Sequence, residues 1–252
     1  MTDSSALYQY VLRMADNALI IGQRLSEWCG HGPILEQDMA MTNIALDFVG
    51  QARSLFQYAA ELEGSGKTED DLAFLRDVWD FKNFLLLEQP NGDFAHTICR
   101  QFLFDAYNYY FHLELKNSTD QQLAAIAEKS LKEVTYHLRW SSEWMIRLGD
   151  GTDLSHGKIQ KALDHLWMYT GEMTTADELD QTLADQGIGV DLNKIKPLWN
   201  EKVNAILKEA TLTRPEDAWM QSGGKQGKHS EQLGFILAEM QYLQRAYPGQ
   251  QW

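Results

Sequence analysis

The chain has little of what marks a disulfide scaffold or a membrane protein. Its 252 residues include 2 cysteines and 5 prolines, and no uninterrupted apolar run reaches the roughly 18 residues of a membrane span. The cysteines, Cys29 and Cys99, lack metal-type spacing, and the first residues form neither a basic nor an apolar leader region. We therefore expect a protein of the reducing cytoplasm, without disulfides and away from the membrane.

Basic residues are also scarce. The 22 Lys and Arg residues stand against 36 Asp and Glu residues, which gives a formal net charge of −14. This excess of negative charge argues against non-specific binding to nucleic acid and against an anionic membrane surface. The length and a hydrophobic content of 44% suit one globular domain over residues 1–252.

Motifs of nucleotide and hydrolase chemistry are missing from the sequence. It contains no Gly-x-Gly-x-x-Gly, P-loop or Gly-x-Ser-x-Gly pattern, and no segment alternates as a strand does. Apolar residues instead recur at helical spacing through most of the chain. The spacing predicts long helices over about 7–28, 35–60, 71–87, 94–117 and 127–148, and shorter ones over 155–171, 174–185, 191–210 and 230–246. Ser118 or Thr119 is the candidate N-cap of the fifth long helix, and Gly149 ends it.

These helices predict an all-α, ferritin-like bundle, with a core over roughly 5–150 and accessory helices over roughly 152–252. The first helix presents one clear apolar seam, formed by Leu7, Val11, Met14, Ala18, Ile21, Leu25 and Trp28. The predicted seam of the second helix consists of Leu35, Met39, Thr42, Leu46, Val49, Phe56 and Ala60.

The fifth long helix contains a metal motif that is almost complete. Di-iron bundles take one Glu from each of two helices and a Glu-x-x-His from each of the other two. Here Glu133 is followed at i+3 by Tyr136, and His137 comes one residue late. None of the 7 histidines falls between residues 32 and 95, and the second helix has Asp47-x-x-Gly50 instead. The sequence therefore predicts a bundle that has lost its metal.

Two other readings of these histidines are weaker. Glu133 and His137, at i and i+4, share one helix face as the ligands of zinc helices do, but no second His-bearing helix faces them in the sequence. We favour a hydrogen-bonded core histidine. The Asp-x-x-His matches at 93–96 and 153–156 begin beside glycine-containing turns, and we attribute both to chance.

A bundle without metal needs other partners for its buried charges. Asp105 falls on the seam of the fourth helix, where an unpaired carboxylate would be costly. Arg53 and Arg139 are the candidate partners, and the alternative is that these arginines reach solvent. Trp140 and Trp144 are interpreted as core or helix-docking residues.

The segment at 222–229, Ser-Gly-Gly-Lys-Gln-Gly-Lys-His, is the one unusual loop. Its backbone amides and lysines could meet phosphates. A flexible, solvated turn before the last helix is the preferred interpretation.

Several blocks of sequence resemble the family of C subunits of bacterial phenylacetyl-CoA epoxidase, a ring 1,2-epoxidase. The blocks are 23–31 (Gln-Arg-Leu-Ser-Glu-Trp-Cys-Gly-His), 47–53 (Asp-Phe-Val-Gly-Gln-Ala-Arg), 87–92 (Leu-Glu-Gln-Pro-Asn-Gly), 136–139 (Tyr-His-Leu-Arg), 223–231 (Gly-Gly-Lys-Gln-Gly-Lys-His-Ser-Glu) and 237–245 (Leu-Ala-Glu-Met-Gln-Tyr-Leu-Gln-Arg). The similarity covers essentially the whole chain.

The resemblance implies a structural, non-catalytic subunit of a multicomponent monooxygenase of aerobic phenylacetate degradation. It implies a related catalytic subunit that carries the di-iron centre, a further small subunit, and a reductase subunit with FAD and iron–sulfur that takes electrons from NADPH. No metal or cofactor is expected on this chain. The region of the lost metal site is then the one around Asp47, Asp105, Glu133, Tyr136 and His137.

The family also implies that a subunit of this type reaches the phenylacetyl-CoA bound mainly on the catalytic subunit. The matching positions here are Asp80, Phe81, Lys82 and Asn83, and less closely Gln181, Thr182 and Leu183. Lys82 stands where a smaller polar residue is expected. Two alternatives remain open: a degenerate ferritin-like oxidase acting on its own through Glu133 and His137, and an adaptor that binds CoA esters without an oxygenase.

Overall fold

The computed structural model describes residues 3–250, with side chains from Ser5 onward, and this part of the chain contains helices and no strand. It divides into two compact units. Unit 1 joins the chain up to Pro90 with the chain from Gly223 onward, and unit 2 runs from Asn91 to Ser222. The predicted single domain over residues 1–252, with a core over roughly 5–150 and accessory helices, stays a prediction. No helix of the described part is long and apolar enough to cross a membrane.

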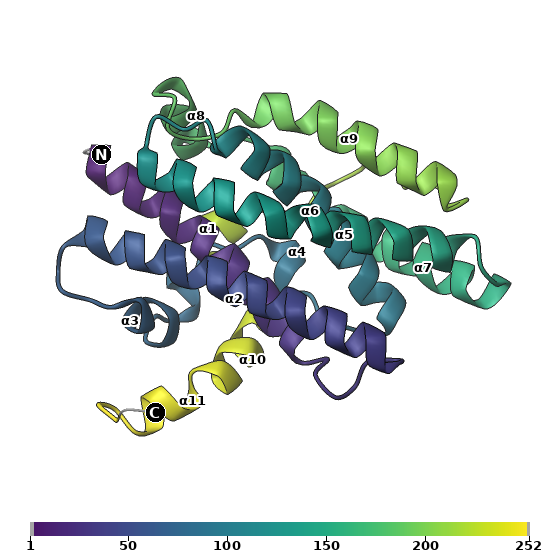
Figure 1. Ribbon diagram of the computed structural model, residues 1–252, viewed down its shortest axis with the longest axis horizontal. Coiled ribbons are helices and arrows are strands. Elements are labelled where there is room, and N and C mark those ends of the chain that lie inside the picture. Colours follow the sequence, from purple (N-terminus) through teal and green to yellow (C-terminus); the bar gives the residue numbers. More distant parts are fainter. Residues whose placement is uncertain (1–2, 251–252) are drawn as a thin grey trace. The chain divides into compact units, whose positions relative to one another are not determined.

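Unit 1 is built on a hairpin of two long helices that lie side by side (Figure 1). Its helices are α1 (Asp3–Ser26), α2 (Leu35–Glu63), α3 (Glu69–Phe74), α4 (Leu85–Glu88), α10 (Glu231–Met240) and α11 (Tyr242–Ala246), with 3-10 turns η1 (Val78–Asp80) and η4 (Gly224–Gln226). The apolar seam predicted for α1 is confirmed at the buried residues Val11, Met14, Ala18, Ile21 and Leu25.

The seam predicted for α2 is wrong over its first half. Leu35, Met39, Leu46 and Val49 are exposed. The buried stripe of α2 consists of Met41, Ile44, Ala45, Phe48, Gln51, Ala52, Leu55, Phe56 and Ala59. Both stripes have helical periodicity, so the pattern alone does not tell which one faces α1.

The predicted helix over 71–87 is interrupted after α3. Two polar side chains of α1 hold the chain there in an extended form: Asp16 Oδ2 accepts from the backbone N–H of Lys82 at 2.9 Å, and Asn17 Oδ1 accepts from that of Phe84 at 2.8 Å. A continuous helix would place these N–H groups in its own ladder, so the two contacts and the helix exclude each other.

Unit 2 is built on the hairpin of α5 and α6, against which α7 and α9 pack (Figure 1). Its helices are α5 (Phe94–Leu115), α6 (Gln121–Gly149), α7 (Asp153–Leu166), α8 (Glu178–Asp185) and α9 (Leu192–Glu209), with 3-10 turns η2 (Trp167–Tyr169) and η3 (Gly171–Thr174). Asp120, rather than Ser118 or Thr119, caps α6 by accepting from the N–H of Leu123 at 2.8 Å.

Candidate functional site

A row of buried polar side chains runs along one face of α5. Gln101, Asp105, Asn108 and His112 follow one another at spacings of four, three and four residues, and all four are buried. This spacing places them on the side of α5 that would otherwise belong to the apolar core. Polar groups in that position need partners inside the protein, because burial separates them from water.

Asp105 is fully buried at the centre of this row and accepts two hydrogen bonds. Gln101 Nε2 donates to Oδ1 at 2.6 Å, and Ser141 Oγ on α6 donates to Oδ2 at 2.7 Å. Burial raises the pKa of Asp105 to about 6, although nearby His137 and the two hydrogen bonds act in the opposite direction. The Oε1 atom of Gln101 has no hydrogen-bond partner within the described part of the chain.

The predicted arginine partners of Asp105 are wrong. The Arg53 side chain is 70% exposed and lies 3.4 Å from Glu69. Arg139 is also exposed, with its guanidinium 5.6 Å from the centre of the Tyr136 ring. The neighbours that offset the charge of Asp105 are therefore Gln101, Ser141 and His137.

Both histidines of this region are buried. His137 has 0% of its surface exposed, as expected for a core histidine. The Nδ1 atom of His112 lies 2.9 Å from the carbonyl oxygen of Asn108, and burial lowers the pKa of His112 to about 4. His112 is accordingly neutral at pH 7, with its proton on Nδ1, which donates to that carbonyl.

The register of α6 corrects the interpretation of its metal-like motif. Tyr136 is 40% exposed and Glu133 is half-buried, whereas Val134 and His137 are both fully buried. The inward pair at i and i+3 is therefore Val134 and His137, and Tyr136 does not take a ligand position. Relative to Glu-x-x-His, the helix keeps a histidine and has Val134 in place of the carboxylate.

The buried side chains do not fit a di-iron centre, which takes four carboxylates and two histidines. The inward-facing row on α5 and α6 offers one carboxylate, Asp105. Asp47 on α2 is half-buried. No group of three or more His, Cys, Asp or Glu side chains in residues 3–250 is arranged to hold a metal ion.

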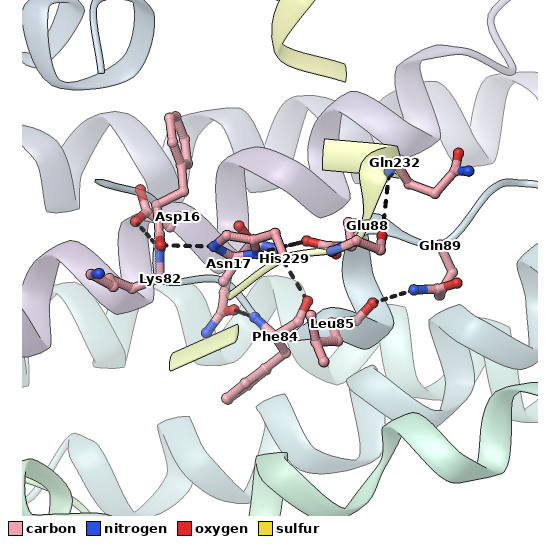
Figure 2. Close-up of polar contacts among 12 residues, drawn as sticks. Asp16, Asn17, Lys82, Phe84, Leu85, Glu88, Gln89, His229 and Gln232 are labelled. Carbon is pink, nitrogen blue, oxygen red and sulfur yellow. Dashed lines mark hydrogen bonds and ion pairs between the residues drawn. The ribbon is translucent and has the colours of Figure 1, made fainter. Parts of the chain in front are cut away.

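A second buried polar cluster lies in unit 1 around Glu88 (Figure 2). Its carboxylate accepts from the N–H of Ser230 at 2.7 Å, from Asn83 Nδ2 at 3.1 Å and from His229 Nδ1 at 2.8 Å. Arg24 donates twice to the backbone carbonyl of Glu88, at 2.7 and 3.2 Å. We call these five residues the Glu88 cluster. It links the start of α10 to α4 and to the end of α1.

The contacts of His229 require a proton on each ring nitrogen when Glu88 is ionised. Nε2 lies 2.8 Å from the carbonyl oxygen of Phe81, which can only accept, and Nδ1 faces the carboxylate of Glu88. Burial lowers the pKa of His229, but the bonds to Glu88 and Phe81 outweigh burial, so the pKa is raised overall. The pair is an ion pair with both side chains fully buried.

The predicted substrate segment at 80–83 is half surface and half core. Asp80 is exposed and Lys82 is partly exposed. Phe81 and Asn83 are fully buried: the guanidinium of Arg76 lies 4.1 Å from the centre of the Phe81 ring, and Asn83 donates to Glu88. Arg76 is itself paired with buried Asp16. Burial raises the pKa of Asp16, although Arg76 acts in the opposite direction.

The second predicted substrate segment lies on α8 in unit 2. Gln181 and Thr182 are exposed, and Leu183 is buried. Gln181 Nε2 donates to Asp185 at 2.7 Å, and Thr182 Oγ1 donates to the carbonyl of Glu178 at 2.7 Å. Both polar side chains are therefore accessible from solvent.

The glycine–lysine loop is packed, which contradicts the preferred interpretation as a flexible solvated turn. Lys225 is 6% exposed and its Nζ lies 5.9 Å from the centre of the Phe84 ring. Gly227 has φ +79°, and a Cβ there would lie 2.5 Å from the carbonyl oxygen of Trp79. The glycine allows the loop to pass directly over η1.

Sequence reasoning missed the Glu88 cluster. Its one visible signal is Glu88 itself, a single charge that follows the apolar run Phe84–Leu87 and precedes Pro90. Its partners Arg24 and His229 lie 64 and 141 residues away in the chain. No local periodicity connects positions so far apart.

Comparisons with known proteins agree with the sequence resemblance. The model of a family described as phenylacetic acid catabolic protein matches residues 1–252. The C subunit of the 1,2-phenylacetyl-CoA epoxidase of Escherichia coli (strain K12) is 52% identical over 246 residues, which cover 98% of this chain and 99% of that protein. The predicted all-α, ferritin-like fold class is confirmed. The chain belongs to the phenylacetic acid catabolic protein family.

Proposed function

We propose that this chain is a non-catalytic structural subunit of a multicomponent phenylacetyl-CoA 1,2-epoxidase in aerobic phenylacetate degradation. The observation that carries the proposal is the donor set between α5 and α6. The inward pair on α6 is Val134 and His137, and the buried carboxylate Asp105 is satisfied by Gln101 and Ser141. A di-iron bundle needs inward-facing carboxylates and histidines on such helices, whereas the buried groups here are satisfied by hydrogen bonds.

The other parts of the enzyme follow from the same proposal. A related catalytic subunit holds the di-iron centre, a small subunit accompanies it, and a reductase subunit with FAD and iron–sulfur delivers electrons from NADPH in the cytoplasm. The name of the 52% identical relative, the C subunit of an epoxidase, supports this assignment. The oxygen chemistry belongs to the catalytic subunit, and this chain supports that subunit structurally.

This chain also contributes to the pocket for the CoA ester. The two predicted segments belong to different units and are proposed separately: the accessible side chains are Asp80 and Lys82 in segment 80–83, and Gln181 and Thr182 in segment 181–183. The buried members Phe81, Asn83 and Leu183 keep the backbone of their segments in place. Beside Asp80 lies a hollow of about 430 Å³, lined by Ser65, Gly66, Lys67, Asp71, Leu72, Leu75, Arg76 and Asp80.

The pocket contribution is tested with Lys82→Ala in the assembled enzyme. We expect a higher KM for phenylacetyl-CoA with unchanged assembly, and an effect of about fivefold or less, because exposed charge pairs contribute at most about 1 kcal/mol. Lys158→Ala, at an exposed lysine that forms an ion pair with Asp93, is the control. An unchanged KM in the Lys82 variant removes Lys82 from the pocket.

The structural role is tested by omission. Epoxide formation is measured with the catalytic subunit, reductase, NADPH and phenylacetyl-CoA, with and without this chain, and then with this chain in place of the catalytic subunit. We expect activity in the full mixture, a loss of activity without this chain, and none from this chain alone. Epoxide formation by this chain and reductase supports the degenerate oxidase, and an unaffected catalytic subunit supports the adaptor.

A further inference from the structure

An apolar stripe faces solvent on the first half of α2. Leu35, Met39, Leu46 and Val49 are 71, 56, 63 and 39% exposed, and Ile34 just before the helix is 52% exposed. These four helical residues, with the half-buried Thr42 between them, follow a spacing of four and three residues. We call Ile34, Leu35, Met39, Leu46 and Val49 the α2 stripe.

The spacing of the α2 stripe is the one by which helices pack against helices. Residues at alternating intervals of four and three form a seam along a helix, which inserts into a matching seam on a second helix. From Leu35 to Val49 the seam extends over about 21 Å at 1.5 Å per residue. Single exposed apolar residues are ordinary on protein surfaces, but a continuous seam of this length marks an interaction site.

Charge around the α2 stripe selects the kind of partner. Glu36, Asp38 and Asp47 flank it, and no Lys or Arg occurs in α2 before Arg53. A second copy of this chain would bring one acidic border against another, in a molecule whose net charge is already −14. A helix with Lys or Arg beside its apolar seam would complement both features.

The composition of the surface also matches that of a protein–protein interface. A stable interface buries about 800 Å² on each partner, with an apolar centre and a polar rim. The α2 stripe supplies such a centre, and its acidic border supplies part of the rim. We infer that the α2 stripe is a docking face for an amphipathic, basic-bordered helix of the catalytic subunit. This inference rests on the proposed function, because that proposal supplies the partner.

The experiment replaces two central residues with charges. Met39→Glu/Leu46→Glu puts carboxylates into the seam, and Leu154→Glu on α7 makes the same change at a residue that is 71% exposed outside the stripe. Each chain is mixed with the catalytic subunit, and the dissociation constant is measured by sedimentation velocity. Thermal melting of the isolated chains checks that each variant folds as the unsubstituted chain does.

The inference predicts that Met39→Glu/Leu46→Glu weakens association about 100-fold or more, while Leu154→Glu changes it less than about threefold. Glu36→Lys is expected to weaken association at low salt and to lose this effect at high salt. If the unsubstituted chain binds the catalytic subunit and the double variant binds equally well, the inference fails and the proposed function stands.

The remaining outcomes separate the two claims. If the unsubstituted chain does not bind the catalytic subunit at all, both the proposed function and the inference fail. If it instead forms a dimer that the double variant abolishes, a second copy covers the α2 stripe and the argument from charge is overturned.

Discussion

Asp105→Asn tests the buried row on α5 most sharply, because the variant removes a charge and can keep the hydrogen bonds. Ser141 Oγ can still donate to the amide oxygen of the new side chain. Gln101 donates to Asp105 through Nε2 and has an unsatisfied Oε1. A rotation of its amide by half a turn would let Oε1 accept from the new Asn side chain. The substitution can therefore keep both hydrogen bonds of this side chain while it removes the buried charge.

The size of the effect follows from the pKa of Asp105, which is about 6 in the folded protein against an ordinary value of 3.8. A shift of about two pKa units corresponds to about 3 kcal/mol between the charged and neutral forms. Because the folded pKa is raised, Asp105 loses stabilisation as pH rises from about 4 to 6, and the full penalty is present at pH 7. The Asp105→Asn variant carries no charge at this position and therefore does not have this penalty.

Urea unfolding, followed by tryptophan fluorescence from pH 4 to 7.5, measures this effect at low protein concentration, since the sequence pI is about 4.8. We expect the free energy of unfolding of the variant to exceed that of the unsubstituted chain by about 0.5 kcal/mol at pH 4 and about 3 kcal/mol at pH 7. Glu128→Gln, the matching change at an exposed position of α6, should stay within about 0.5 kcal/mol at every pH. Destabilisation of Asp105→Asn at pH 7 would refute the reasoning and point to a cation at Asp105.

Three further predictions concern unit 1. Glu88→Gln leaves His229 with a buried charge that no longer has its carboxylate partner. In urea unfolding the variant should lose about 3–5 kcal/mol of the free energy of unfolding. A loss below about 1 kcal/mol would contradict the buried ion pair. Because the pKa of His229 is raised, its stabilisation is complete below about pH 6.5 and is lost as pH rises through the folded pKa. His229→Gln should abolish this part of the pH dependence of the free energy of unfolding above about pH 6.5, and an unchanged pH dependence would count against the prediction. Gly227→Ala should lower the free energy of unfolding in urea by about 2 kcal/mol or more, since its Cβ meets the Trp79 carbonyl at positive φ. Gly50→Ala in α2 has open space around its Cβ and should be neutral or stabilising in the same measurement.

Helix existence was predictable from the sequence because periodicity and capping act locally. Of the five long predicted helices, α1, α2, α5 and α6 form, and the buried seam of α1 includes most of the expected residues. The prediction for 71–87 failed because Asp16 and Asn17, on a different helix, capture backbone N–H groups of that segment. Contacts of this kind have no signal in the local pattern.

The same limit applies to the candidate site. Burial of Asp105 and His137 was predictable, since each lies on an apolar helix face. The orientation of Tyr136 was not, because the motif Glu133-x-x-Tyr136 was placed without the register of α6 against α5. On α2, two apolar stripes compete for the core, and only packing against α1 decides which one is buried.

Iron content of the isolated chain tests the central claim most directly. The chain is expressed in iron-supplemented medium, purified without the catalytic subunit, and its iron per polypeptide is determined by elemental analysis. We predict iron far below one atom per chain, because the inward positions of α5 and α6 offer Val134, Gln101 and Ser141 where a di-iron centre would need carboxylates. Iron at one or two atoms per chain, lost in an Asp105→Ala variant, would contradict the account.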